Sequence, residues 1–438
     1  MFVSDLDMLK EIMVAKFDSF SDRMFFAMYG APPVNEMLHV LPGERWRPMR
    51  RLLSPTFSIL KLKQMQYIVQ EKLEIFSELM EKKAESGKCF DITKNFESLT
   101  LDVFGQYAFA VGADCQRNSS DPFYVQCRKV FDELQFEKSW LLQLSVLFPE
   151  LDPYISRFRT WTGFGAAELI LLKSFRKVME KRIEIYKDIQ SSDMLQQMVE
   201  LSQEGNAATN QKPLSMDTIV SNSVLFLLAG YETTSTGLGF AAWLLAKHPK
   251  EQKTLQEELD KEFAPNKPVT YEAVRKLPYL DAVFHESLRV FPPVIYFTAR
   301  TCVKSCTING HRFQPGVIVN VPVYNIHRNP ELWPEPERFD PQRFYQKSER
   351  HPLSWIPFGA GPRNCIGVRF AEMEFKMCIS RLLLGHNLEM GPESEVELKI
   401  HQHGALLRPK NGIIVKVSKR SVPYKPEFFA EGINKKEN

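Results

Sequence analysis

The chain has 438 residues, a formal net charge of +3, and a composition that is 44% hydrophobic and 25% charged. That length and apolar fraction can bury a large core, and the small net charge gives no argument for nucleic-acid binding. Seven cysteines without C-x-x-C pairs indicate a reduced, intracellular chain rather than a disulfide framework or a zinc site. No run reaches the ~18 apolar residues that span a bilayer, and no signal-peptide pattern opens the chain, so the sequence reads as a soluble polypeptide.

The first chemically informative stretch is residues 43–50 (Gly-Glu-Arg-Trp-Arg-Pro-Met-Arg), which predicts the start of a helix with proline in its first turns. Trp46 and Arg50 are four residues apart, so both side chains project from one helix face. An indole N–H and a guanidinium on one face form a donor pair for a ligand carboxylate. Helical patterns continue over residues 61–84 and 90–109.

Large side chains gather in residues 121–190, and for most of them the expected place is an ordinary helical core. The helical pattern of this segment breaks at residues 148–153. Further along, the polar residues 203–214 predict an exposed loop. The large side chains are Phe123, Tyr124, Phe131, Phe136, Trp140, Phe148, Tyr154, Phe158, Trp161 and Phe164.

A long helix is predicted over residues 216–247, capped by Ser215 and stopped by His248-Pro249. It would cross about 45 Å, the width of a whole domain. Its middle, residues 229–235 (Ala-Gly-Tyr-Glu-Thr-Thr-Ser), puts a glycine, a glutamate and two threonines in an apolar helix interior. Such a local conflict is expected where function overrides helix propensity, although a kink stabilised by threonine-to-carbonyl bonds is the alternative.

The next helix is predicted over residues 280–291, where Glu286 and Arg289 share a face and can pair. Asn309-Gly310 predicts a hairpin between residues 306–308 and 311–313, followed by a strand over 317–321. A second hairpin-like return is predicted at residues 409–417. His327 is interpreted as structural, because nothing pairs it with a second metal-binding group.

One cysteine lies in a loop of three glycines, residues 358–367 (Phe-Gly-Ala-Gly-Pro-Arg-Asn-Cys-Ile-Gly), just before an amphipathic helix over 368–384. Glycine lets backbone approach a flat ligand closely, and the helix N-terminus stabilises negative charge on sulfur. Haem iron accepts a cysteine thiolate as axial ligand. The alternative is a buried free cysteine in a helix-capping loop.

The complete pattern Phe-x-x-Gly-x-Arg-x-Cys-x-Gly resembles the haem-binding signature of the cytochrome P450 superfamily, and motifs from residue 20 to about 420 follow the order of that family. The amino-acid sequences of residues 229–234 and 358–367 are most similar to those of the animal microsomal branch that contains the 3A-type oxidases and thromboxane synthase. The resemblance implies a mainly α fold with a smaller β region. It also implies one catalytic domain over residues 1–420, without the N-terminal anchor section of its relatives, and a polar tail over 421–438.

The resemblance assigns roles to residues throughout the chain. Cys365 would be the axial ligand of haem b, with Phe358 packed near its sulfur. In the 229–235 stretch, Thr233 and Glu232 would manage oxygen and protons, with room for oxygen left by the preceding alanine and glycine. The expected propionate-binding residues are Trp46, Arg50, Arg300, Arg363 and, by alignment, Arg23.

Glu286 and Arg289 resemble a structural pair of the family that a downstream arginine locks in place. Arg338 and Arg343 are both candidates for that arginine, and Arg343 better fits the family's distance to the cysteine. The resemblance also makes residues 121–190 the roof of a substrate cavity. Residues 293–297 would line the cavity, and the turn at 404–407 would touch substrate.

The implied activity is a monooxygenase that inserts one atom of O₂ into lipophilic substrates such as xenobiotics, steroids or fatty acids. Electrons would come from NADPH through NADPH–cytochrome P450 reductase, with cytochrome b5 as a further candidate donor. Arg369 and Lys376 near the cysteine loop are candidates to dock an acidic partner, or else a solvated face. By resemblance the protein would contact the cytoplasmic face of the endoplasmic reticulum membrane peripherally.

Two alternatives stay open from the sequence. One is a haem isomerase or lyase of the thromboxane-synthase type, which needs no reductase. Such relatives lack a threonine at the position of Thr233, so this residue favours monooxygenation. The other is a truncated, non-catalytic haem-binding product.

Overall fold

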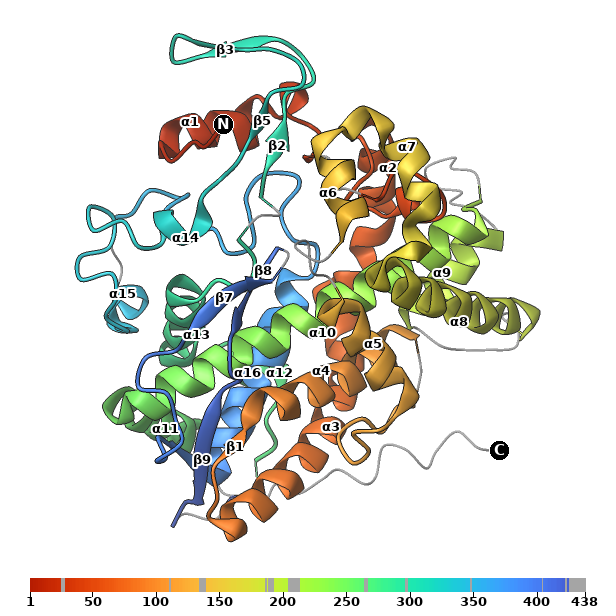
Figure 1. Ribbon diagram of the computed structural model, residues 1–438. Coiled ribbons are helices and arrows are strands. Elements are labelled where there is room, and N and C mark those ends of the chain that lie inside the picture. Colours follow the sequence, from red (N-terminus) through yellow and green to blue (C-terminus); the bar gives the residue numbers. More distant parts are fainter. Residues whose placement is uncertain are drawn as a thin grey trace.

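The computed structural model of the chain describes residues 1–24, 28–109, 112–133, 139–185, 187, 193–203, 213–263, 267–295, 298–346, 349–403, 405–421 and 424. Over these residues the fold is mostly helical, with small antiparallel sheets at its margins (Figure 1). The mainly α architecture with a smaller β region is therefore confirmed. None of the helices in these ranges is long and apolar enough to span a bilayer.

The long helix α10 (Met216–Lys247) crosses the middle of the molecule (Figure 1). Its bounds match the prediction, because the Ser215 hydroxyl accepts the Thr218 N–H at 3.1 Å and His248-Pro249 follows its end. Nearly all of its side chains are buried, since helices pack around it. These are α4 (Ile92–Phe109), α8 (Gly163–Ile185), α13 (Pro278–Val290) and α16 (Val368–Gly385).

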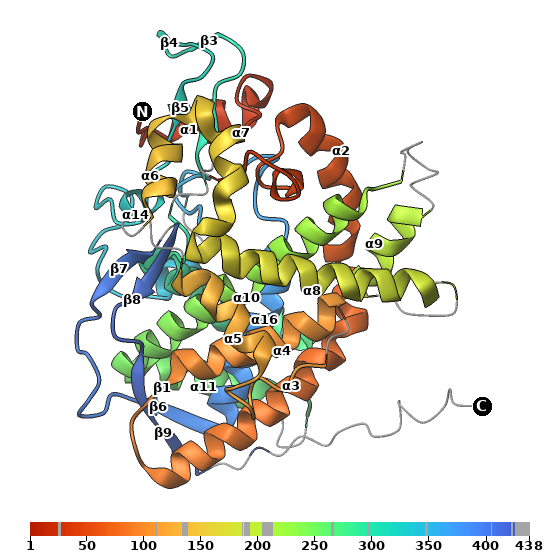
Figure 2. The same cartoon turned by 45° about the vertical axis from the view of Figure 1, so that its right-hand side comes forward.

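The other helices form shorter layers around this core, and α8 runs across the bundle in Figure 2. They are α1 (Leu6–Lys10), α2 (Gly43–Leu53), α3 (Ile59–Ser86), α5 (Pro122–Asp132), α6 (Trp140–Leu147), α7 (Asp152–Ile155), α9 (Met194–Gln203), α11 (Pro249–Glu262), α12 (Tyr271–Val274), α14 (Val323–Ile326) and α15 (Gln342–Tyr345). Short 3₁₀ or π turns are η1 (Glu11–Ala15), η2 (Phe17–Ser19), η3 (Val34–Glu36), η4 (Ser54–Phe57), η6 (Pro149–Leu151) and η7 (Ser156–Trp161).

The strands pair in four small antiparallel sheets. One has the order β1 (Phe90–Asp91), β9 (Ile414–Lys419), β6 (His386–Glu389). The others are β2 (Arg300–Thr301) with β5 (Ile318–Val319), β3 (Cys306–Ile308) with β4 (His311–Phe313), and β7 (Ile400–His403) with β8 (Leu406–Pro409).

The hairpin predicted at Asn309-Gly310 is confirmed, and both residues have the positive φ, 48° and 78°, that such a turn requires. The predicted return of residues 413–417 onto 409 is wrong, because β9 pairs with β1 and β6 while β8 pairs with β7. Asp91 explains this course, since its Oδ1 accepts the Ile413 N–H at 3.0 Å and directs the chain toward β1.

Aromatic residues of the 121–190 segment divide between core and surface. Tyr124 and Phe164 are buried as expected, whereas Phe136 and most of the loop 203–214 lie outside the described residues. The core prediction is wrong for one set, because residues 140–161 form an outer layer that buries only a few side chains such as Leu141 and Ile155. The exposed set is Trp140, Phe148, Tyr154, Phe158 and Trp161, the last 71% exposed.

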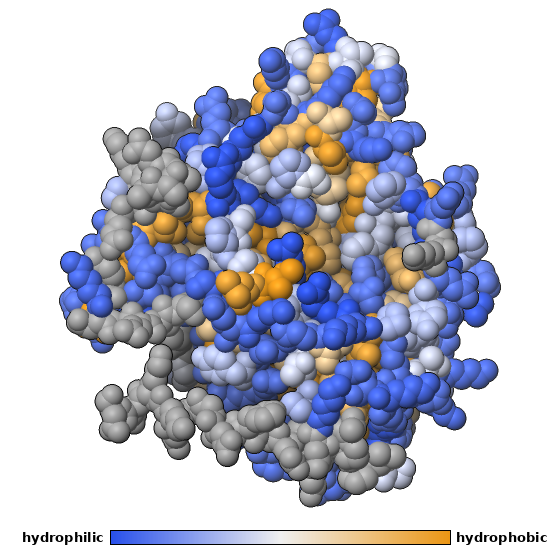
Figure 3. All heavy atoms as spheres, turned by 180° about the vertical axis from the view of Figure 1, so that it is seen from behind, coloured by the Kyte–Doolittle hydropathy of each residue, from blue (hydrophilic) through white to orange (hydrophobic). Residues whose placement is uncertain are grey.

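The molecule viewed from behind has a largely hydrophilic surface in which hydrophobic side chains gather around the middle of the face (Figure 3). The principal hydrophobic core lies around α10, and a smaller apolar cluster joins α1 to the β2–β5 sheet through residues such as Leu9, Phe20 and Val319. The expected tail over residues 421–438 lies outside the described residues except for 421 and 424.

Candidate active site

A cavity of about 500 Å³ lies between α10 and the loop that precedes α16. We call it the central cavity. Cys365 lies in its wall on the loop side, while Ala229, Gly230 and Thr233 line it from α10. The rest of the lining is mainly apolar, with Phe131 and Phe164 contributed by the segment that was expected to form a roof. Such a cavity suits a large, flat, mostly apolar ligand.

The cysteine loop is shaped by backbone contacts. The Cys365 N–H donates to the Phe358 carbonyl at 2.9 Å, and Phe358 stacks on Phe284 at 6.1 Å between ring centroids. Gly361 has a φ of 69°, and a Cβ there would lie 1.9 Å from the Met13 carbonyl oxygen. Only glycine therefore fits at this position, where the loop passes against the N-terminal segment.

Cys365 lines the central cavity and is exposed in it. Burial raises the pKa of the Cys365 thiol, while the N–H of Gly367 and the positive charges of Arg50 and Arg23 act in the opposite direction. These donors and charges would stabilise a thiolate once a metal ion binds it, because metal ligation requires the deprotonated sulfur.

Four arginines predicted to bind carboxylates reach the central cavity from distant parts of the chain: Arg23, Arg50 on α2, Arg300 on β2 and Arg363. The Arg363 guanidinium is held by the carbonyls of Ser21 at 2.8 Å and Leu41 at 2.7 Å. Its carbon also lies 4.5 Å from the centroid of the Trp46 ring, so Trp46 belongs to the same cluster. The structure thus brings all five predicted residues to one cavity.

Further hydrogen bonds of the cluster go to backbone or to uncharged groups. Arg23 donates to the Arg363 carbonyl at 2.8 Å, and Arg300 donates to the Ala360 carbonyl at 3.1 Å. Arg50 donates to the side-chain oxygen of Asn364 at 3.1 Å. These three acceptors are uncharged oxygens, which satisfy donor hydrogens without balancing a positive charge.

Burial and mutual repulsion disfavour the positive charge of these arginines. Burial lowers the pKa of Arg23 to about 10 and that of Arg363 to about 9, and mutual repulsion acts in the same direction. Burial and the charges of Arg23 and Arg363 also hold the pKa of Arg300 well below its usual range. Within the described residues, Nη1 of Arg363 and Nε of Arg300 are buried without a hydrogen-bond partner. Carboxylates of a ligand would satisfy both the donors and the charges, so the site fits a haem with two propionates.

His39 also lines the central cavity and was missed by the sequence reasoning. Burial, followed by the charges of Arg23, Arg159 and Arg363, lowers the pKa of His39 to about 3, so the imidazole is neutral at physiological pH. No pattern around residue 39 signals this position, because the cavity forms only when α2, α10 and the cysteine loop come together.

The two residues expected to manage oxygen and protons face different spaces. The Thr233 hydroxyl lines the central cavity and donates to the Ala229 carbonyl at 2.7 Å. Glu232 is 2% exposed, and its Oε1 accepts from Nε of Arg408 on β8 at 2.6 Å. Adjacent helix residues point about 100° apart, which explains the separation. The sequence signal that could have identified Arg408 as a partner of a buried acid is its place as a lone arginine in the apolar strand Leu406–Pro409.

Glycine at position 230 has a packing reason as well as the expected steric one. A Cβ on Gly230 would lie 2.6 Å from ring carbons of Phe104 on α4. The glycine thus allows α4 and α10 to approach each other closely.

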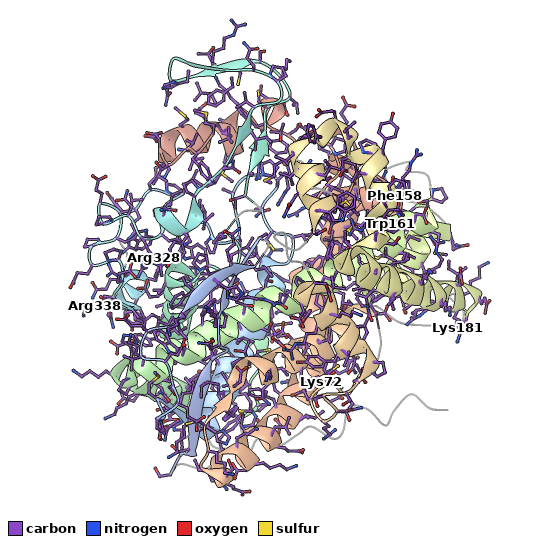
Figure 4. The ribbon with its side chains drawn as sticks, in the orientation of Figure 1. Lys72, Phe158, Trp161, Lys181, Arg328 and Arg338 are labelled. Carbon is purple, nitrogen blue, oxygen red and sulfur yellow. The ribbon has the colours of Figure 1, made fainter. Side chains whose placement is uncertain are left out.

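Glu286 and Arg289 form a fully buried ion pair away from the cavity, with nitrogen–oxygen distances of 2.7 and 2.8 Å. Nε of Arg343 lies 3.4 Å from Oε1 of Glu286, so the structure brings Arg343 to the pair. Arg338 contributes only its backbone carbonyl, which accepts from Arg289 at 3.1 Å. Its side chain is 60% exposed, pairs with Glu335 and points outward in Figure 4.

Two further expectations concern the surroundings of the site. Lys376 does not face solvent, because it is buried between Asp281 at 2.7 Å and Glu372 at 2.6 Å; its proposed docking role is therefore wrong. Arg369 is exposed. Of the segments expected to line the cavity, Pro293, Val294, Ala405 and Leu406 do so, whereas residues 296–297 and 404 lie outside the described residues. His327 is buried, and its Nε2 accepts the Ile356 N–H at 2.9 Å.

A thiol that opens onto an apolar cavity, with arginine donors for two carboxylates, defines a haem-thiolate protein. Comparison with known proteins agrees: residues 1–417 match the family model of cytochrome P450, and the chain belongs to this family. Cytochrome P450 3A29 of Sus scrofa is 35% identical over 421 residues, covering 95% of this chain and 82% of the relative. Cytochrome P450 3A6 of Oryctolagus cuniculus is 36% identical over 427 residues, covering 96% and 83%.

Family membership establishes the general chemistry of the protein. It is a cytochrome P450 monooxygenase, and its cofactor is haem b held by a cysteine thiolate. Its reaction involves O₂, a lipophilic substrate and a redox partner.

Proposed function

We propose that Cys365 is the axial haem ligand and that the protein oxygenates lipophilic substrates with electrons delivered from NADPH by NADPH–cytochrome P450 reductase. The observation that carries this proposal is the central cavity itself, in which Cys365 and Thr233 face one apolar space. An apolar space of this kind admits lipophilic molecules such as xenobiotics, steroids or fatty acids. Cytochrome b5 is a further electron donor of the same proposal.

Haem bound in this cavity would supply the thiolate-assisted activation of O₂. The residues around it then have separate tasks. Arg23, Arg50, Arg300 and Arg363, with Trp46, would bind the two propionates and orient the ring. Phe358 would keep water from the Cys365 sulfur.

Thr233 is proposed to hold a hydroxyl proton beside the reacting oxygen. Its hydroxyl donates to the Ala229 carbonyl of the same helix, and rotation about χ1 would turn it toward the cavity. Glu232 would renew that proton from the other side of α10.

Isotope labelling tests the proposal. Haem-loaded protein, reductase, NADPH and labelled O₂ should give a lipophilic product that carries one labelled oxygen atom. Isomerisation of a peroxide without NADPH, combined with no NADPH-dependent incorporation of label, would instead identify the isomerase alternative.

Peripheral contact with the endoplasmic reticulum membrane, on its cytoplasmic face, is part of the same proposal. Residues 140–161 expose a group of aromatic and aliphatic side chains on one outer layer, and Figure 4 places Phe158 and Trp161 there, near α7. Their rings lie 4.8 Å apart between centroids. Exposed aromatic clusters with polar tips suit the membrane–water interface.

Sedimentation with phosphatidylcholine vesicles tests this contact. A variant with Phe158→Ser and Trp161→Ser should no longer sediment with the vesicles. Tyr345→Ser, which changes an exposed aromatic residue on α15, is the matched control and should still sediment with them. Equal binding of both variants would contradict the assignment of this surface.

A further inference from the structure

A second cavity, of about 630 Å³, lies on the other side of α10 from the central cavity. We call it the polar cavity. Its walls come from α4, α5, α10 and the β7–β8 hairpin, and α4 and α10 pack directly against each other. Figures 1 and 2 show α4, α5 and α10 close together in both views. Glu232 and Thr236, one turn apart on α10, face the polar cavity, whereas Thr233 and Gly237 face the central cavity.

Glu232 has a spare acceptor in the polar cavity. Its Oε1 is bonded to Arg408, but its Oε2 is buried and has no hydrogen-bond partner among the described residues. An unsatisfied carboxylate oxygen is costly in the interior, and buried polar atoms of this kind normally bind water or receive a proton. The cavity beside it is polar and large enough for several water molecules.

Glu97 on α4 lines the same cavity and is the second carboxyl of the site. Its Oε2 accepts a hydrogen bond from the Tyr124 hydroxyl at 3.0 Å. Burial raises the pKa of Glu97 to about 7, and the negative charge of Glu232 acts in the same direction, while Arg128, the Tyr124 bond and Arg408 oppose it. A carboxyl group with this pKa can hold and release a proton near physiological pH.

Charged and titratable groups face Glu97 from each element around the polar cavity. Asp91 comes from β1 and Lys94 from the start of α4. Helix α5 contributes Tyr124, Arg128 and Asp132, and α10 contributes Tyr231 and Glu232. The β7–β8 side contributes His401, Arg408 and Lys410.

The polar cavity reaches bulk water. Lys94 is exposed, and the Asp132 side chain is 53% exposed, yet both line the same cavity as the deeply placed Glu232. Glu97 and Glu232 thus share one polar cavity with side chains that reach solvent.

We propose that Glu97 is a proton-holding residue for the monooxygenase reaction: it takes a proton from water in the polar cavity and passes it to Oε2 of Glu232. This inference rests on the proposed role of Glu232 and Thr233. The step moves one proton and no electrons: the O–H bond on Glu97 breaks, an O–H bond on Glu232 forms, and solvent returns a proton to Glu97. Monooxygenation reduces one oxygen atom to water and consumes protons, so a repeated supply is required. Glu97 touches neither substrate nor oxygen, and it acts only through Glu232, as a positioning residue.

The proposal is tested first in the resting, haem-loaded protein, without turnover. Infrared titration should show a carboxylic-acid C=O band that disappears near pH 7. The band should be absent in Glu97→Gln and present in the matched control Lys94→Gln, one turn away on α4. In Tyr124→Phe the band should titrate at higher pH, because the lost hydrogen bond had lowered the pKa of Glu97.

Turnover supplies the second readout. With reductase, NADPH and a lipophilic substrate, Glu97→Gln should lower product per NADPH by about 10-fold, less than the ~10²-fold of a proton donor in direct contact, since water can partly replace Glu97. The yield in wild type should fall as pH rises through 7, that of Glu97→Gln should not change there, and Glu97→Asp should restore part of it.

The outcomes distinguish failure of the Glu97 role from failure of the proposed monooxygenase function. Unchanged coupling in Glu97→Gln overturns the inference, whether or not the infrared band is lost. A loss of coupling without loss of the band also overturns it, because the effect is then structural. Failure of wild type to incorporate labelled oxygen overturns the proposed function instead, and the infrared assignment of Glu97 is independent of that result.

Discussion

Thr233 and Glu232 are neighbours in sequence, but their side chains lie in different cavities on two sides of α10. Thr233 faces the central cavity, which Cys365 lines from the loop side, and Glu232 faces the polar cavity, paired with Arg408. A proton that moves from Glu232 to the central cavity must therefore pass from one side of α10 to the other. On the central-cavity side, the adjacent residue Thr233 presents a hydroxyl that donates to the Ala229 carbonyl.

Replacement of Thr233 tests the central-cavity side of this arrangement. Thr233→Ala should bind haem normally but lower product formed per NADPH by about 10²-fold, the contribution of a proton-transfer group in direct contact. The measurement is the ratio of product to NADPH consumed. Thr236→Ala, one face away in the polar cavity, is the matched control, and equal uncoupling by both variants would contradict a specific role for Thr233.

Loss of the Arg363 guanidinium should release haem. Arg363→Leu removes two hydrogen bonds to carbonyls, each contributing about 1.5–3 kcal/mol for a charged donor, and one of the charges proposed to bind propionate. Haem content per protein after purification measures the effect. Arg369→Leu changes an exposed arginine at the same end of the loop and should retain haem. Full haem content in Arg363→Leu would argue against the assigned propionate site.

The two candidate arginines near Glu286 can be separated by stability. Arg343→Ala removes a cation 3.4 Å from a fully buried carboxylate and should lower the free energy of unfolding by up to about 3–5 kcal/mol. Arg338→Ala removes an exposed ion pair and should change it by about 0.5 kcal/mol or less. Denaturant unfolding of both variants decides the matter, and a larger loss in Arg338→Ala would reverse the assignment.

Gly230 should not tolerate a methyl group. Gly230→Ala places Cβ 2.6 Å from the Phe104 ring, and overpacking of this kind costs about 1–3 kcal/mol despite the better helix propensity of alanine. Thermal unfolding should show the loss, and Phe104→Leu in the same chain should recover part of it. Gly237→Ala meets its nearest neighbour at 3.6 Å and serves as the tolerated control. Equal stability of the two alanine variants would show that α4 can move away.

His39 gives a pH dependence with a definite sign. Its pKa falls from its usual 6.5 to about 3 on folding, so the unfolded chain binds more protons between these values. Stability from this group is present above pH 6.5 and is lost as pH falls toward 3, by at most about 1.4 kcal/mol per pH unit. Denaturant unfolding of haem-free protein should show a shallower pH slope in His39→Gln. The slope should be unchanged in His311→Gln, which alters an exposed histidine.

The sequence was most informative where a local pattern carries the structure. Ser215 and His248-Pro249 bound the long helix, and Asn309-Gly310 bounds a hairpin, because capping and turn chemistry act over a few residues. The loop around Cys365 and the Trp46–Arg50 spacing likewise pointed to the central cavity.

The rest depends on contacts between distant segments. His39 and Glu97 enter the cavities only through packing of α2, α4, α5 and α10, and the partner of Glu232 lies 176 residues away in Arg408. The outer layer at residues 140–161 has core-like composition, and its exposure follows from its place over the helical core rather than from any local signal.

The central claim is that Cys365 supplies a thiolate to haem within an assembled cavity. The most direct measurement is the absorbance spectrum of the haem-loaded protein after reduction and binding of CO. The red-shifted Soret band of a thiolate-ligated haem is predicted, and it should disappear in Cys365→Ser while it persists in Cys378→Ser, a buried cysteine on α16. A wild-type spectrum without the red-shifted band, or one unaffected by Cys365→Ser, would contradict the account.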